Sequence, residues 1–133
     1  MAIELDHVIV PAKNQADSAR RLGEILGVRW AESGIGPFSP VYVNDGLTLD
    51  FIDDDSAFPV QHFCFRVGDT EFDGILGRIA AAGIKYRCAV RGPEDMRVNT
   101  DYGGRMVYWN EPDGHQWEML TVSYARPPSG TID

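Results

Sequence analysis

An internal repeat constrains the fold of this chain more than any other feature of its 133 residues. In each half, a histidine lies in an alternating, strand-like segment, a helical segment follows, and a glycine marks the end of the helix. The distance from His7 to Gly27 is 20 positions, and that from His62 to Gly83 is 21. Two structural copies of one supersecondary unit therefore account for nearly the whole chain.

Each copy is predicted to have the order βαβββ. The helices are expected over residues 17–26 and 70–79, the second beginning at a variant capping box formed by Thr70 and Asp73. Period-2 alternation and turn signals predict the strands. The expected strands are residues 3–10, 28–32, 41–44 and 47–52 in the first copy, and 61–67, 85–90, 105–110 and 115–121 in the second.

These elements predict an α+β protein with one domain over residues 1–133. Unit one is expected at about residues 3–53 and unit two at about residues 60–122, with a mobile tail over residues 124–133. The main difference between the copies is the polar, glycine-containing stretch 91–104, which is predicted to be a long loop.

Composition limits the partners. A formal net charge of -8 and a pI of about 4.7 disfavour nucleic acid and anionic membranes as partners. No apolar run approaches the roughly 20 residues of a membrane span, and the first ten residues carry acids where a signal peptide has Lys or Arg. The expected location is therefore the cytoplasm.

Cys64 and Cys88 are far apart in the sequence and are expected to be buried thiols rather than a disulfide or a zinc knot.

Both copies carry a pair of potential metal ligands. The first strand supplies His7 or His62, and the last strand supplies Asp50 or Glu118. Imidazole and carboxylate suit a divalent transition metal and leave coordination positions open for a substrate. A lone strand histidine is more often a core residue than a ligand, but its repetition at matching positions favours the metal hypothesis.

Aromatic and basic residues near the predicted cavity have two interpretations. Most such residues fill the core or line its rim, yet Tyr102 and Arg105 are suited to bind an anionic or enolic substrate. His115 is expected to be a solvated turn residue. The candidate substrate-binding residues are Trp30, Phe38, Arg66, Tyr102 and Arg105.

Three segments carry a family resemblance. His7 within LDHVIV, His62 within QHFCFRV, and Glu118 within GGRMVYWNEPDGHQWEML resemble the vicinal oxygen chelate superfamily, which includes glyoxalase I, extradiol dioxygenases and bleomycin-resistance proteins. The resemblance covers about residues 3–122. It implies that the two units form a paired, partly open barrel in a homodimer.

The resemblance also implies a metal site. His7, His62 and Glu118 fall on the ligand positions, and Asp50 falls where glyoxalase I has a fourth ligand, a Glu. One divalent ion is expected, with Fe, Zn, Mn, Ni and Mg not distinguished. Asp50 is one methylene shorter than Glu, so it either reaches the ion or accepts hydrogen bonds from water or substrate.

These observations lead to two principal functional hypotheses. The first is a metal-dependent lyase or isomerase of glyoxalase type, with Glu118 moving a proton, or a dioxygenase; either acts on a small substrate that chelates the metal through two neighbouring oxygens. The second is a protein that sequesters a drug or metabolite without turnover. A former enzyme with a vestigial metal site is a third possibility.

Overall fold

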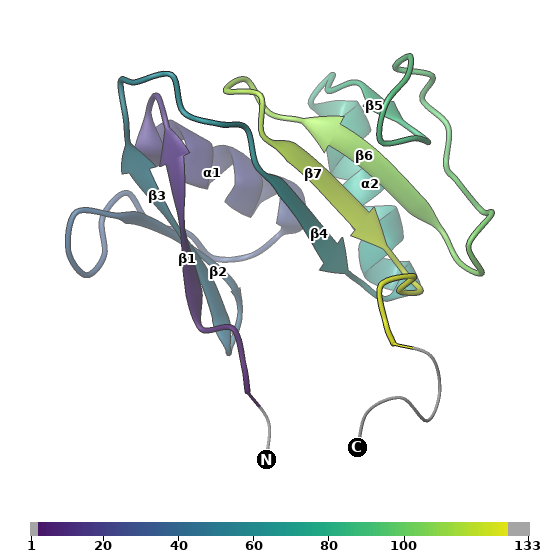
Figure 1. The fold of residues 1–133 in the computed structure, drawn as a ribbon, viewed down its shortest axis with the longest axis horizontal. Helices are drawn as coiled ribbons and strands as arrows, with labels where there is room; N and C mark the ends of the chain where they lie inside the picture. Colours follow the sequence, from purple (N-terminus) through teal and green to yellow (C-terminus); the bar gives the residue numbers. More distant parts are fainter. Residues whose placement is uncertain (1–2, 128–133) are drawn as a thin grey trace. The chain divides into compact units, whose positions relative to one another are not determined.

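The computed structural model describes residues 3–127. The chain divides into two compact parts, Met1–Pro59 and Val60–Asp133, here called unit 1 and unit 2. Each contains one helix and one small sheet (Figure 1). The predicted α+β class is confirmed. Within the described part of the chain, no helix is long and apolar enough to span a membrane.

Unit 1 consists of β1 (His7–Ala12), α1 (Gln15–Leu26), β2 (Ser39–Asn44) and β3 (Leu47–Asp53). Its sheet has the order β1-β3-β2, with β1 parallel and β2 antiparallel to β3 (Figure 1). Helix α1 contacts all three strands. Alternation along β1 buries Val10 and Ala12 on one face of the sheet and leaves His7 and Ile9 on the other, where Ile9 is 48% exposed.

The ends of α1 follow from its sequence. The Asn14 side chain caps the helix by accepting a hydrogen bond from the Asp17 N–H at 3.1 Å. Gly27 has a φ of 73° and donates its N–H to the Gly23 carbonyl, so the predicted glycine stop is confirmed.

Two strand predictions in unit 1 were too long. The strand expected over residues 3–10 begins only at His7, because its partner β3 begins at Leu47, just after the hairpin turn. The strand expected over 28–32 is reduced to a single bridge between Trp30 and Val41. Unit 1 thus has the order βαββ in place of βαβββ.

Unit 2 has the predicted order βαβββ. It consists of β4 (His62–Arg66), α2 (Asp69–Ala81), β5 (Tyr86–Arg87), β6 (Met106–Asn110) and β7 (Gln116–Leu120). The sheet order is β4-β7-β6-β5, with β4 parallel to β7 and the other pairs antiparallel (Figure 1). The apolar stripe of α2 is buried through Phe72, Ile75 and Ile79.

Local chemistry in unit 2 departs from three expectations. The helix cap is formed by Gly68 with Glu71, whose carboxylate accepts the Gly68 N–H, because α2 begins one residue before Thr70. The strand expected over 85–90 is only two residues long, because the chain turns away after Arg87. His115 is fully buried, not solvated, since its Nδ1 accepts the Gln61 N–H at 2.9 Å where β4 begins.

The cysteines also differ from expectation, whereas the mobility of the tail stays a prediction. Cys64 is exposed and Cys88 is half-buried; their thiols lie beside the carboxylates of Glu118 and Asp95, so they are not core residues. Of the tail predicted to be mobile over 124–133, residues 128–133 lie outside the described residues. Tyr124 is held by hydrogen bonds to Glu118.

Candidate functional site

The candidate ligands occupy matching positions in the two sheets. In unit 1, His7 pairs with Thr48, and Asp50 lies two residues further along β3. In unit 2, His62 pairs with Gln116, and Glu118 lies two residues further along β7. Because side chains two residues apart share a face, each histidine lies on the same face as its carboxylate. Asp50 is therefore the register equivalent of Glu118.

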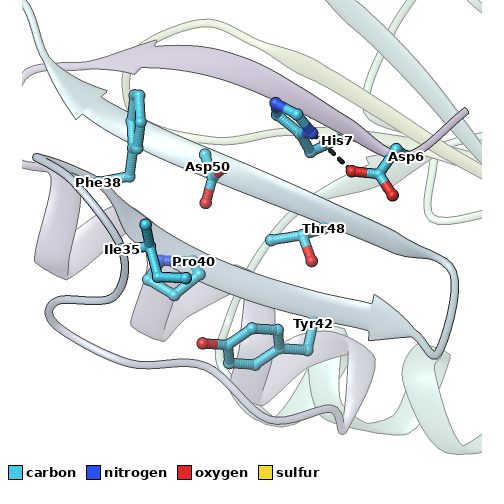
Figure 2. A pocket seen from close by; sticks show the side chains of 8 residues that line it. All are labelled: Asp6, His7, Ile35, Phe38, Pro40, Tyr42, Thr48 and Asp50. Atoms are coloured by element: carbon cyan, nitrogen blue, oxygen red, sulfur yellow. Dashed lines mark hydrogen bonds and ion pairs between the residues drawn. The ribbon is translucent and has the colours of Figure 1, made fainter.

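The His7/Asp50 pair lines a pocket in unit 1 with a cavity volume of about 320 Å³ (Figure 2). The His7 Nδ1 lies 2.7 Å from the Asp6 carboxylate, and this hydrogen bond raises the pKa of His7. An Nδ1–H that donates to Asp6 leaves the Nε2 lone pair available for a metal or substrate. Partial burial raises the pKa of Asp50, against the opposing charge of His7.

The same pocket has an apolar wall. Ile35 and Phe38 come from the loop before β2, and Pro40 and Tyr42 lie on β2 itself (Figure 2). A pocket that combines such a wall with a few polar groups is typical of a small-molecule site. Phe38, predicted from the sequence as a substrate contact, therefore lies beside two of the candidate ligands.

The His62/Glu118 pair in unit 2 combines a buried carboxylate with a partly exposed imidazole. The Glu118 side chain is 0% exposed, and its Oε1 lies 3.0 Å from the Nε2 of His62, whose own side chain is 43% exposed. The Tyr124 hydroxyl lies 2.9 Å from Oε1 and 2.8 Å from Oε2 of the same carboxylate. These contacts supply the hydrogen-bond donors that a buried carboxylate requires.

Neutral groups surround this carboxylate. Cys64 on β4 and Tyr108 on β6 pair with Glu118 across the sheet. Desolvation, together with the Glu118 carboxylate, raises the pKa of Cys64 to about 12, so the thiol stays protonated at neutral pH. Burial likewise raises the pKa of Tyr108, whose ring stacks on His62 at a centroid distance of 6.1 Å.

The donor set fits a divalent metal ion. Ligand atoms bound at about 2.1 Å and at right angles to one another lie about 3.0 Å apart, and His62 Nε2 and Glu118 Oε1 have that separation. Among the residues that the structure describes, no group of three or more His, Cys, Asp or Glu side chains is close enough to hold an ion. The three-ligand set of His7, His62 and Glu118 therefore stays a prediction.

Four other predicted substrate contacts are located as follows. Arg105 forms ion pairs with Asp69 and Asp73 and lies 4.4 Å above the Phe72 ring, so these contacts hold it against α2; its role as a substrate contact stays a prediction. Trp30 packs against Gly23 of α1. The remaining two are exposed: Arg66 at the end of β4, and Tyr102, whose ring centroid lies 5.7 Å from that of Tyr124.

Sequence analysis missed two residues of this region. Asp6 directly precedes His7, and a carboxylate beside a candidate ligand was the available signal. Tyr124 lies six positions after Glu118 in a segment with no periodic pattern, so no sequence signal connected it with the carboxylate.

Comparison with solved structures gives two similar oxidases. Oxidase ChaP-H2 is 39% identical and matches 94% of this chain and 98% of its own, with a TM-score of 0.85. Oxidase ChaP-H1 is 42% identical over 94% of this chain and 100% of its own, also with a TM-score of 0.85. A glyoxalase/dioxygenase from Nostoc punctiforme, 21% identical over 90% of this chain and 91% of its own, shares the fold with a TM-score of 0.65. No family model and no curated protein matches.

Proposed function

The chain belongs to the vicinal oxygen chelate superfamily, and on that premise we propose that it is a divalent-metal-dependent enzyme that oxidises a small substrate bearing two neighbouring oxygens. The observation that carries the proposal is the pair formed by the buried Glu118 and His62, whose Oε1 and Nε2 atoms are 3.0 Å apart. A buried carboxylate beside an imidazole is costly for a protein that only sequesters an apolar ligand, but it is suited to a metal ion.

The proposed ligands are His7, His62 and Glu118, with His7 oriented by Asp6. Both imidazoles would bind through Nε2, and Glu118 through Oε1, the oxygen nearest to His62. When bound, the ion supplies Lewis acidity toward the two substrate oxygens, with redox chemistry in addition if it is iron or manganese. The choice among Fe, Zn, Mn, Ni and Mg is left to the experiment below.

Unit 1 would receive the substrate. Phe38 and Tyr42 would contact an aromatic ring in the pocket of about 320 Å³. Asp50, whose pKa is raised by partial burial, is suited to accept the proton of a substrate hydroxyl at its carboxylate oxygen. In this proposal Asp50 handles the proton and Glu118 holds the ion, whereas a glyoxalase-type isomerase would use Glu118 to move the proton.

Oxidation is favoured over isomerisation for two reasons. Two solved relatives above 30% identity are named as oxidases. In addition, Asp50 occupies the position at which the resemblance to glyoxalase I implies a Glu.

We also propose that the protein is a homodimer and lies in the cytoplasm. Light scattering coupled to size exclusion tests the dimer directly, because its mass would be twice 14.8 kDa.

An oxygen electrode tests the reaction. The metal-free protein is loaded separately with each candidate ion and given a panel of vicinal dihydroxy aromatics; a thiohemiacetal tests the isomerase alternative. We expect oxygen uptake with one of the redox-active ions, and its loss in Asp50→Asn. Tight binding of an aromatic that is recovered intact with every ion would replace the enzyme with the sequestering alternative.

A further inference from the structure

The hydroxyl of Tyr124 is centred on the carboxylate of Glu118. It lies 2.9 Å from Oε1 and 2.8 Å from Oε2, while the carboxylate itself is 0% exposed. We propose that Tyr124 is a positioning residue for metal binding: it keeps Glu118 oriented with Oε1 toward the ion and with Oε2 held by the phenol. This inference rests on the proposed metal site.

The two carboxylate oxygens have different surroundings. Oε1 is shared by His62 and Tyr124, and Oε2 accepts a hydrogen bond from Tyr124. The side chains of Cys64 and Tyr108 also interact with the carboxylate. An ion bound beside His62 would replace the hydrogen bond between His62 Nε2 and Glu118 Oε1, because both of these atoms would then bind the ion. The tyrosine hydroxyl can then donate to Oε2 alone, which disfavours binding of the ion by both oxygens.

Tyr124 reaches this carboxylate from outside the sheet. It follows β7, and its residue is 48% exposed although its hydroxyl contacts a buried group. Its ring lies against that of Tyr102, and its hydroxyl also interacts with Tyr108. A Phe at position 124 would keep the ring and its contact with Tyr102, so the hydroxyl can be removed without removing the packing.

Cobalt(II) is the probe for the test. The metal-free parent, Tyr124→Phe and Tyr102→Phe are titrated with cobalt(II) in competition with a chromophoric chelator, and visible spectra are recorded. Loss of an outer hydrogen bond to a metal ligand typically weakens metal binding about 10- to 100-fold. We therefore expect Tyr124→Phe to bind cobalt(II) about 10- to 100-fold more weakly than the parent. We also expect an altered cobalt spectrum, because a carboxylate bound through both oxygens changes the coordination number.

Tyr102→Phe is the matched control. It removes the hydroxyl from Tyr102, whose ring contacts that of Tyr124. The affinity of this variant for cobalt(II) should stay within about twofold of that of the parent. Thermal unfolding of all three proteins monitors the fold. An equal loss in Tyr102→Phe would assign the effect to packing and overturn the proposal.

The remaining outcomes separate this proposal from the proposed function. If the parent binds cobalt and Tyr124→Phe has the same affinity and spectrum, the positioning role is wrong and the metal site stands. If the parent itself does not bind cobalt, both proposals are wrong.

Discussion

The two units place their equivalent carboxylates in different environments, although both histidines are partly exposed. In unit 1, the His7 side chain is 58% exposed, and Asp50 borders an open pocket. In unit 2, Glu118 is fully enclosed and already hydrogen-bonded to His62 and Tyr124. A shared strand register therefore does not give the two carboxylates a shared environment. In our proposal both histidines bind the ion, Glu118 is the third ligand, and Asp50 faces the substrate.

The difference has a physical origin in the residues around each pair. In unit 1, loop residues such as Phe38 leave a cavity beside the carboxylate. In unit 1 the antiparallel strand partner of Asp50 is Pro40, whereas in unit 2 the partner of Glu118 is Tyr108, and the Tyr124 hydroxyl lies against the carboxylate. Asp50 is also one methylene shorter than Glu118, so the carboxylate of unit 1 projects less far from its strand.

Isosteric amide variants should separate the two roles most strongly. Glu118→Gln removes the charge of a proposed ligand, so we expect metal affinity to fall by more than the roughly 100-fold seen for outer-shell changes. Asp50→Asn should keep most of the affinity but lose turnover, because the proton acceptor is gone. Isothermal titration with the ion found in the native protein measures the first effect, and the oxygen electrode measures the second. Equal loss of metal in both variants would contradict the division of roles.

Glycine substitutions should have opposite effects on the two helices. Gly23 and Gly77 are each the ninth residue of their helix. A Cβ on Gly23 would lie 2.6 Å from the Trp30 ring, so Gly23→Ala should lower the free energy of unfolding by about 1–3 kcal/mol. A Cβ on Gly77 meets nothing within 4 Å, so Gly77→Ala should raise it by about 0.5–1 kcal/mol. Urea unfolding gives both changes in the free energy of unfolding. Changes of the same sign would show that the surroundings of Gly23 or Gly77 differ from those described here.

The smallest expected effect concerns the charges on α1. Hydrogen bonds from Arg20 and Arg21 hold the pKa of Asp17 below its usual value. A carboxyl whose pKa is lowered on folding stabilises the folded state at pH values above its unfolded-state pKa, which is near 4. This stabilisation is lost as the pH falls through the folded-state pKa. Asp17→Asn should therefore cost less than about 1 kcal/mol at pH 7, because the pair is exposed, and less at pH 3 than at pH 7. Thermal unfolding at the two pH values checks this, with Asp55→Asn, an exposed aspartate of unit 1, as the control; a cost at pH 3 as large as that at pH 7 would exclude the charge as its cause.

The repeat in the sequence was enough to predict the helices and the α+β class, and the resemblance of three segments to a known superfamily predicted the family. Period-2 alternation and glycine stops depend on neighbouring residues, so they are visible in the sequence. The register equivalence of Asp50 and Glu118 was also predicted, because it follows from spacing along similar strands.

The environment of each side chain could not be predicted in the same way. His115 follows a turn that usually leads to solvent, yet its ring is buried because the distant Gln61 N–H needs an acceptor. Arg105 was predicted as a substrate contact, and the sequence did not predict that two carboxylates of α2 bind its guanidinium. Both outcomes depend on pairings between residues more than 30 positions apart, which local patterns do not encode.

Metal content tests the central claim most directly. The parent is purified without chelator and analysed by elemental mass spectrometry beside His7→Ala, His62→Ala and Glu118→Ala. The remaining histidine of the chain provides the control, His115→Asn, which keeps an acceptor for the Gln61 N–H. We predict near-stoichiometric metal in the parent and the control, and loss in the three ligand variants. A parent that holds no metal, even after incubation with each candidate ion, would contradict the account.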